Sequence, residues 1–351
     1  LVGRYIDRVP LTRYLLFVGT GLITAMLVLA NSVGYASLLL AFFLLRLFGQ
    51  GLLPHAGQTV MARQFEADRG KALSIASTGR PLGEVLLPSF ILLTMAILNW
   101  RSTWMLYALI GATIFLPLLL LLAARTSGPE PVKVKTGEDQ PTNPSLQPMN
   151  GHTVTQVLQD LGFWLILPVM LAAPLITTGV FIHQGFVLFE KSWEPEQFAL
   201  GFILYGSMHW ISMLCTGVFI DRFSAVAVSK VFMVPLTLAV AILAFFDGIW
   251  AIFAFMFLAG TSVGAMGPVS GALWAEVYGV ANLGAIRSII IALMVFATAV
   301  APFSAGLAID AGVSMQSMLT TVLVGMAAAL VAAFVAYRRP ANPTQSERGA
   351  P

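Results

Sequence analysis

Ten apolar stretches, each about 20 residues long or longer, follow one another along the 351-residue sequence. They lie at residues 13–32, 35–62, 71–98, 100–124, 156–189, 196–220, 227–247, 249–278, 283–309 and 313–337. A helix of about 20 apolar residues crosses the hydrocarbon core of a bilayer, whereas barrel strands alternate over roughly 10 residues. These stretches are continuous, and only 10% of all residues are charged, against about 25% in water-soluble domains. The sequence therefore predicts an all-α polytopic membrane protein.

A six-residue pattern occurs twice, at residues 3–8 and 217–222, with glycine, isoleucine, aspartate and arginine in matching places. The same offset of 214 residues relates three further pairs inside the apolar stretches: Pro54 with Pro268, Gly57 with Gly271, and Pro88 with Pro302. A proline in a membrane helix removes a backbone hydrogen bond, so matched prolines count for more than matched leucines. The offset predicts two homologous helical bundles.

The two copies of the pattern differ in what precedes them. Within the second half, two apolar stretches come before the copy of the pattern, whereas none comes before the copy in the first half. The symmetry of the halves therefore predicts about 60 further residues and two more helices upstream, in a protein of twelve helices arranged as six plus six. On this interpretation the chain holds ten of the twelve.

A polar segment at residues 126–155 separates the halves and contains five prolines among charged and amide side chains. Such a composition buries too little apolar surface to fold, which favours a flexible linker. We expect an N-terminal bundle at 1–125, a C-terminal bundle at 156–338 and a solvated tail at 339–351.

Lysine and arginine are distributed unequally between the two sets of loops. Fifteen lie in loops on the side of the linker, and only Arg101 and Lys191 lie in loops on the other side. Positively charged loops remain in the cytoplasm. The linker and the C-terminus are therefore predicted to be cytoplasmic, in a bacterial inner (plasma) membrane.

The duplicated pattern, the central linker and the run Arg-Leu-Phe-Gly-Gln-Gly at residues 46–51 resemble the major facilitator superfamily over nearly the whole chain. The run resembles that family's fourth-helix arginine motif. The resemblance implies a two-bundle transporter in which the ten stretches are helices 3 to 12. One departure is that the glycine and the basic cluster usually found after Asp-Arg are reduced to Pro10 and Arg13, and only Lys230 remains after the second copy.

A more specific resemblance lies in residues 69–74 and 79–84, followed by Asn-Trp-Arg at 99–101. These segments are similar to bacterial members near the monocarboxylate and oxalate–formate branch of the same superfamily. That similarity implies a carrier of small organic anions.

Three charged residues fall inside apolar stretches: Arg46, Arg80 and Glu84. A charge at the bilayer centre costs about 2.5–3.5 kcal/mol on insertion scales, so it usually faces a cavity or a partner. One interpretation is a structural ion pair of Glu84 with Arg80 or Arg46. The other is that an arginine attracts an anionic substrate while Glu84 carries a coupling proton. The excess of positive charge favours an anion over a cation or a neutral drug.

Two histidines, His183 and His209, also fall inside apolar stretches. Histidine titrates near physiological pH, so either could relay a proton or donate to a carboxylate. The structural alternative is a histidine hydrogen-bonded to a neighbouring helix. The four histidines lack the spacing of metal ligands, so no metal site is expected.

The Asp-Arg pairs of the repeated pattern, Asp7-Arg8 and Asp221-Arg222, are interpreted as gates at the cytoplasmic mouth. An aspartate can stabilise the positive N-terminal end of a helix from the other half. The family resemblance implies that Asp7 meets the helix start near Arg287. The alternative is that both pairs serve only as positive-inside topology signals.

Together these features predict a secondary transporter working by alternating access, with proton-coupled transport of a small organic anion such as a monocarboxylate. The alternatives are efflux of amphipathic drugs and, from another class, a polytopic sensor or enzyme. No cofactor is expected, and the glycines near residue 50 lack the Gly-Lys-Ser/Thr of a nucleotide loop. The expected partners are a small anionic substrate, protons and lipid, without nucleic acid, for a protein acting as a monomer.

Overall fold

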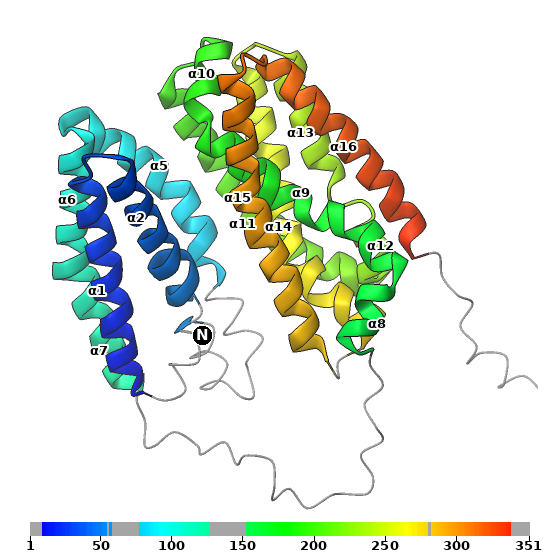
Figure 1. Ribbon diagram of the computed structural model, residues 1–351, viewed down its shortest axis with the longest axis horizontal. Coiled ribbons are helices and arrows are strands. Elements are labelled where there is room, and N and C mark those ends of the chain that lie inside the picture. Colours follow the sequence, from blue (N-terminus) through cyan, green and yellow to red (C-terminus); the bar gives the residue numbers. More distant parts are fainter. Residues whose placement is uncertain (1–8, 55, 58–76, 127–151, 280–281, 338–351) are drawn as a thin grey trace, which may run out of the picture. The chain divides into compact units, whose positions relative to one another are not determined.

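The computed structural model describes residues 9–54, 56, 57, 77–126, 152–279 and 282–337, and the helices that it contains are drawn in Figure 1. Ten helices in this described part of the chain are long and apolar enough to cross a membrane. They correspond one to one with the ten predicted stretches, although the second and third stretches include residues outside the described part. The prediction of an all-α polytopic fold is confirmed.

The chain divides into two compact units. Unit 1 comprises Leu1–Arg80 and Ser89–Thr142, and unit 2 comprises Pro81–Pro88 and Asn143–Pro351. The middle of one helix, Pro81–Pro88, thus groups with unit 2 although its flanks group with unit 1. Most of the predicted linker, from residue 127 to residue 151, lies outside the described residues.

Among its described residues, unit 1 contains three whole spans and most of a fourth, α5, and two of these spans include a π-helical turn. Its elements are α1 (Leu11–Ala30), α2 (Tyr35–Leu45), η2 (Arg46–Leu52), α5 (Gly79–Ile97), α6 (Trp100–Ile110), η3 (Gly111–Phe115) and α7 (Leu116–Thr126). The ring of Phe48, on η2, packs against Gly21 of α1 so closely that an added Cβ would lie 2.3 Å from it. Only glycine permits this approach of η2 to α1.

The turns of unit 1 are held by specific polar contacts. Asn99 caps α6 by accepting a hydrogen bond from the backbone N–H of Ser102 at 2.9 Å, a common helix start. Arg101 donates to the carbonyl of Ser32 at 2.7 Å and lies over the ring of Trp100. This arginine therefore links the turn before α6 to the end of α1.

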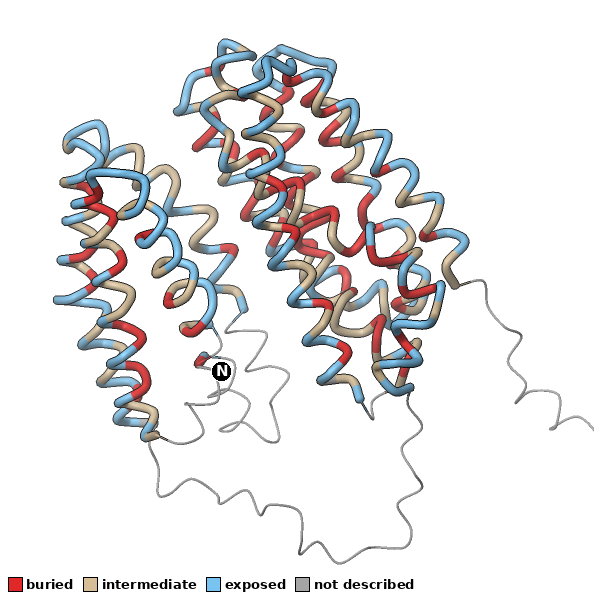
Figure 2. The backbone as a smooth tube through the Cα atoms, viewed as in Figure 1, coloured by how far each residue is buried: buried red, intermediate tan, exposed pale blue. Residues whose placement is uncertain are grey.

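Unit 2 contains six spans and three short helices. Its elements after the linker are α8 (Val154–Gln159), α9 (Leu161–Ile182), α10 (Gln184–Lys191), α11 (Pro195–Phe223), α12 (Ala225–Ser229), α13 (Val234–Phe245), α14 (Trp250–Tyr278), α15 (Leu283–Asp310) and α16 (Met315–Ala336). Helix α14 is the most buried span, packs most extensively on α11 and α13, and supplies many of the buried residues marked in Figure 2.

The single span predicted at residues 156–189 exists, but its bounds are wrong, because the structure divides that region into α8, α9 and α10 and only α9 is long enough to span. The side chain of Asp160 accepts a hydrogen bond from the N–H of Gly162 at 2.9 Å and so starts a new helix. Helix α9 ends at His183, and α10 ends at Ser192 in a left-handed conformation. The apolar composition continues through these breaks, which is why hydropathy alone did not reveal them.

Many large apolar residues are exposed on both units, and Figure 2 marks the exposed positions along the helices in pale blue. Phe43 is 61% exposed, Leu86 63% and Val331 67%. In water such surfaces would be unstable, but lipid tails are as apolar as leucine, so a spanning helix needs no burial on its lipid face. The exposed apolar faces are typical of helices solvated by a bilayer.

Candidate functional site

The charged residues predicted at membrane depth lie on two helices. Arg46 is exposed and begins the π-helical turn η2, and Arg80 is exposed in the first turn of α5. Glu84 lies one turn later on α5, and its side chain is only 20% exposed. Because Glu84 falls within Pro81–Pro88, it groups with unit 2, whereas both arginines group with unit 1.

Glu84 contacts His209, which lies near the middle of α11 in the same unit. The Nδ1 atom of His209 lies 2.5 Å from Oε2 of Glu84, and the histidine side chain is 8% exposed. This distance is shorter than the roughly 2.7–2.9 Å that is usual for a charge-assisted N–H···O hydrogen bond. The contact joins the two side chains that the sequence predicted separately for the proton pathway, and it gives Glu84 a partner that was not among the two arginines considered for it.

His183 has a different environment, at the junction of α9 and α10. Its Nε2 atom lies 2.9 Å from the backbone carbonyl oxygen of Pro302, on α15. This is the kind of contact that the structural alternative for His183 describes. An apolar cavity of about 340 Å³ lies beside it, between α9, α15 and α16, and its few polar side chains include Ser304 and Thr321.

The predicted gating residues are only partly described. Asp7 and Arg8 lie outside the described residues. Asp221 and Arg222 are exposed in the last turn of α11, where the guanidinium of Arg222 lies 5.4 Å from the ring centroid of Phe223. Arg287 is exposed in the first turns of α15. The gating role stays a prediction.

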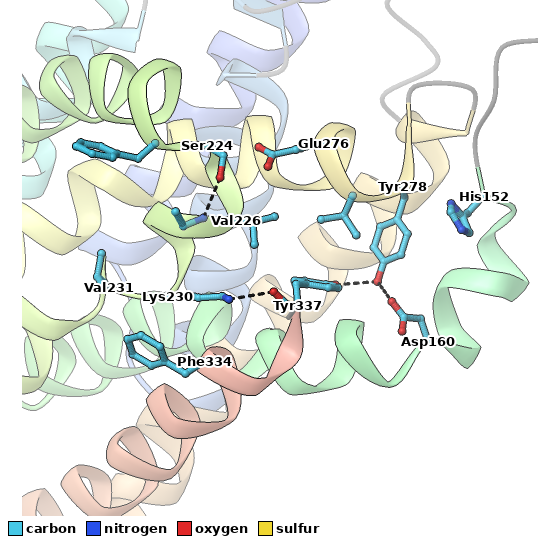
Figure 3. Close-up of a pocket in the computed structure, with 13 residues that line it drawn as sticks. His152, Asp160, Ser224, Val226, Lys230, Val231, Glu276, Tyr278, Phe334 and Tyr337 are labelled. Atoms are coloured by element: carbon cyan, nitrogen blue, oxygen red, sulfur yellow. Dashed lines mark hydrogen bonds between the residues drawn. The ribbon is translucent and has the colours of Figure 1, made fainter. Parts of the chain in front are cut away.

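A larger cavity, of about 910 Å³, lies at the end of unit 2 where α8, α12 and the last residues of α14 and α16 meet (Figure 3). Its wall contains a chain of hydrogen bonds. Tyr278 donates to Oδ2 of Asp160 at 2.6 Å and shares a hydrogen bond of 2.8 Å with the hydroxyl of Tyr337. Lys230 donates to the carbonyl of Tyr337 at 3.0 Å. These contacts join the start of α9 to the ends of α14 and α16.

Sequence reasoning missed this polar cluster, because its four residues are spread over 178 positions, from Asp160 to Tyr337. The available signal was that each polar side chain lies at the end of an apolar stretch. That signal is weak, since polar residues normally border membrane spans.

Burial raises the pKa of the Tyr337 phenol to about 12, from an ordinary value of 10.0. A raised pKa in the folded state means that the neutral phenol stabilises the fold below pH 10, and that this contribution disappears as the pH rises towards 12. We expect the unfolding temperature of the wild type to fall over this range, and that of Tyr337→Phe to fall less. Thermal unfolding in detergent at stepped pH measures the difference; equal slopes for both proteins would contradict it.

Among the described residues, no three side chains of histidine, cysteine, aspartate or glutamate come together in an arrangement that could hold a metal ion. Cys215 is exposed and has a free thiol.

Comparison with known proteins decides the family. A family model described as the Major Facilitator Superfamily matches residues 1–190, more than half of the chain. The chain belongs to the major facilitator superfamily. The assignment confirms the resemblance drawn from the repeated Asp-Arg pattern, and it identifies a multi-pass membrane transporter of the secondary type, which handles a small-molecule substrate within a lipid bilayer.

A solved structure supports the same fold for this superfamily member. The crystal structure of a bacterial homolog of the human lysosomal transporter Spinster, in an inward-facing and unoccupied conformation, matches with a TM-score of 0.60 at 13% identity. The match covers 95% of this chain and 83% of the Spinster homolog. A search of curated proteins found no match.

Proposed function

We propose that this superfamily member is a proton-coupled carrier of a small organic anion, most simply a monocarboxylate, and that it works by alternating access. The observation that carries the proposal is the hydrogen bond between Glu84 and His209 inside an apolar helical protein. Both side chains are ionisable types, and both lie on helices long and apolar enough to span a membrane.

A partly buried carboxylate beside a buried imidazole is suited to holding a transferable proton. Ionisable side chains inside membrane segments are costly, and they commonly mark proton relays in transporters. Imidazole changes its charge near physiological pH, and its proton can pass to the carboxylate it contacts without crossing water. The pair formed by Glu84 and His209 would therefore take up a proton on one side and release it on the other.

The anionic substrate is proposed from charge and from resemblance. Arg46 and Arg80 bring two guanidinium groups to spans that carry a single carboxylate, Glu84. Arginine binds carboxylates through a planar fork of donors. The similarity of residues 69–84 to the monocarboxylate and oxalate–formate branch points to the same substrate class.

The remaining parts of the proposal concern topology. The proposed bundles are residues 1–125 and 156–338, joined by a cytoplasmic linker at 126–155, in a monomer of the bacterial inner membrane. The positive charge of the loops on the linker side supports this orientation. The Asp-Arg pairs at 7–8 and 221–222 would gate the cytoplasmic mouth.

Uptake by proteoliposomes of the complete protein tests the proposal. Labelled lactate, formate and oxalate are supplied with and without an inward pH gradient, and at least one anion is expected to accumulate only with the gradient. Arg46→Ala and Arg80→Ala should weaken uptake or affinity for that anion, because they remove guanidinium donors. Arg125→Ala is the matched control, since Arg125 is an exposed arginine in the last turn of α7.

Two outcomes would oppose the proposal. Uptake that does not respond to the gradient would remove proton coupling, and normal uptake in both arginine variants would remove the anion assignment. Efflux of an amphipathic drug is the second candidate, favoured by the apolar cavity beside His183. The efflux candidate would be supported if vesicles that take up none of the three anions export such a compound when a pH gradient is applied.

A further inference from the structure

Helices α11 and α14 touch through their backbones at two glycines. A Cβ atom added to Gly260 would lie 2.3 Å from the carbonyl oxygen of Tyr205, and one added to Gly264 would lie 2.2 Å from the carbonyl oxygen of His209. Real Cβ atoms essentially never approach a neighbour within 3.0 Å. Since both contacts are with backbone, no side-chain rotation could relieve them.

The two contacts are in register. Gly260 and Gly264 are four residues apart on α14, and Tyr205 and His209 are four residues apart on α11, so one full turn of each helix lies against the other. Small residues at this spacing allow close helix packing in membranes. One turn further along α11, Ser212 donates a hydrogen bond to the carbonyl of Thr261 at 2.6 Å. The backbone of His209 is therefore held between a glycine contact and a polar contact.

The close packing determines where the imidazole of His209 can reach. Its Nδ1 atom is already at 2.5 Å from Glu84, and its side chain is almost fully buried. A shift of the α11 backbone large enough to admit a methyl group at Gly264 would exceed the tolerance of that hydrogen bond, which weakens beyond about 3.2 Å. The position of the histidine thus depends on the absence of a side chain on α14.

We propose that Gly264 is a positioning residue for the proton site, because it determines how far His209 lies from Glu84. The effect of Gly264 on transport rests on the proposed function. Its effect on the distance between His209 and Glu84 does not depend on that function. The titratable groups that the described elements place against His209 are Glu84 of α5 and, in ring contact on its own helix, Tyr205. Helix α14 meets His209 with the backbone of Gly264.

Two alanine variants on α14 separate positioning from ordinary helix substitution. Gly264→Ala adds a methyl against the His209 backbone, whereas Gly267→Ala adds the same methyl where no atom of another helix lies within 4 Å. Gly267 precedes Pro268, so any strain from its new methyl is with the proline ring of the same helix and not with α11. We expect Gly264→Ala to break the hydrogen bond of His209 and Gly267→Ala to preserve it.

The hydrogen bond itself is the first readout. Nitrogen NMR of ¹⁵N-histidine in the complete protein, in lipid bilayers, reports each imidazole, and His209→Gln assigns the signal. In Gly264→Ala, the ¹⁵N chemical shift of His209 should move to the value of an imidazole that has no carboxylate partner. In Gly267→Ala, the shift should match that of the wild type. An unchanged signal in Gly264→Ala, or the same change in Gly267→Ala, would overturn the proposal.

If Gly264→Ala does not fold, Ser212→Ala loosens the same contact without adding atoms. It removes the hydrogen bond to Thr261 and should move the His209 signal in the same direction by a smaller amount. Ser229→Ala is its control, because Ser229 bonds to a carbonyl just before it in the chain, that of Val226. A His209 signal that Ser212→Ala leaves unchanged would count against the proposal.

Transport provides the second readout. Lactate accumulation under a pH gradient needs the proton site, whereas exchange of labelled for unlabelled lactate at equal pH does not. We expect Gly264→Ala to lose accumulation and keep exchange; losing both equally would indicate a merely structural role and reject the proposal. If the NMR change occurs but wild type moves no lactate, formate or oxalate, the proposed function fails while the positioning of His209 stands.

Discussion

Glu84→Gln is expected to abolish proton-driven accumulation of the substrate while leaving substrate exchange close to wild type. Glutamine has the shape of glutamate and can still contact His209, but it cannot take up or release a proton. One pH unit corresponds to about 1.4 kcal/mol, so a carrier coupled to one proton accumulates substrate about tenfold per unit of gradient. In Glu84→Gln that ratio should fall to about one.

The measurement is uptake of labelled lactate into proteoliposomes across a one-unit pH gradient, followed by exchange at equal pH. Glu196→Gln is the matched control, because it makes the same chemical change at an exposed position in the first turn of α11. His209→Gln should behave like Glu84→Gln, since the two side chains form one site. Wild-type accumulation by Glu84→Gln would show that the coupling proton is carried elsewhere.

The largest expected effect on stability comes from Trp274→Ala. Trp274 is fully buried in α14, where its ring stacks on that of Tyr278 and lies 5.6 Å from that of Phe163, centroid to centroid. Truncation of a buried tryptophan leaves a cavity that costs about 3–5 kcal/mol, equivalent here to a fall of about 5–10 °C in unfolding temperature. Thermal unfolding in detergent, followed by the loss of the helical circular dichroism signal, would measure it.

Two further substitutions serve as controls for Trp274→Ala. Trp250→Ala removes the same side chain from the first residue of α14, where it is 53% exposed, and should lower the unfolding temperature much less. Trp274→Phe should cost less than Trp274→Ala, because phenylalanine retains most of the ring and the buried Nε1 has no hydrogen-bond partner among the described residues. Equal losses at the two tryptophans would mean that α14 is not the packing centre of unit 2.

Local composition was sufficient to locate the spans. The stretches predicted at 196–220 and 249–278 correspond to helices at Pro195–Phe223 and Trp250–Tyr278. The agreement has a simple cause, since bilayer thickness sets a minimum length and every backbone group must be bonded within its own helix. The error at 156–189 also has a local cause, because the cap formed by Asp160 interrupts the helix without interrupting its apolar composition.

The candidate site could be predicted only as separate residues. Glu84 and His209 were both identified because an ionisable side chain within an apolar stretch is energetically costly and usually has a partner or a function. Their contact was not predicted, since 125 residues separate them and Arg80, one turn away from Glu84, was the nearer candidate partner. The polar cluster of Asp160, Tyr278 and Tyr337 was missed for the same reason of distance along the chain.

By itself, the sequence determined that this chain is a helical membrane protein with a duplicated Asp-Arg pattern, because hydropathy and repetition are properties of the chain read in order. Only the tertiary structure decided that His209 reaches Glu84 and that glycines of α14 hold it there. Such contacts depend on how closely two helices approach each other. Glycines in the contact, which have no side chain, allow the close approach of α11 and α14.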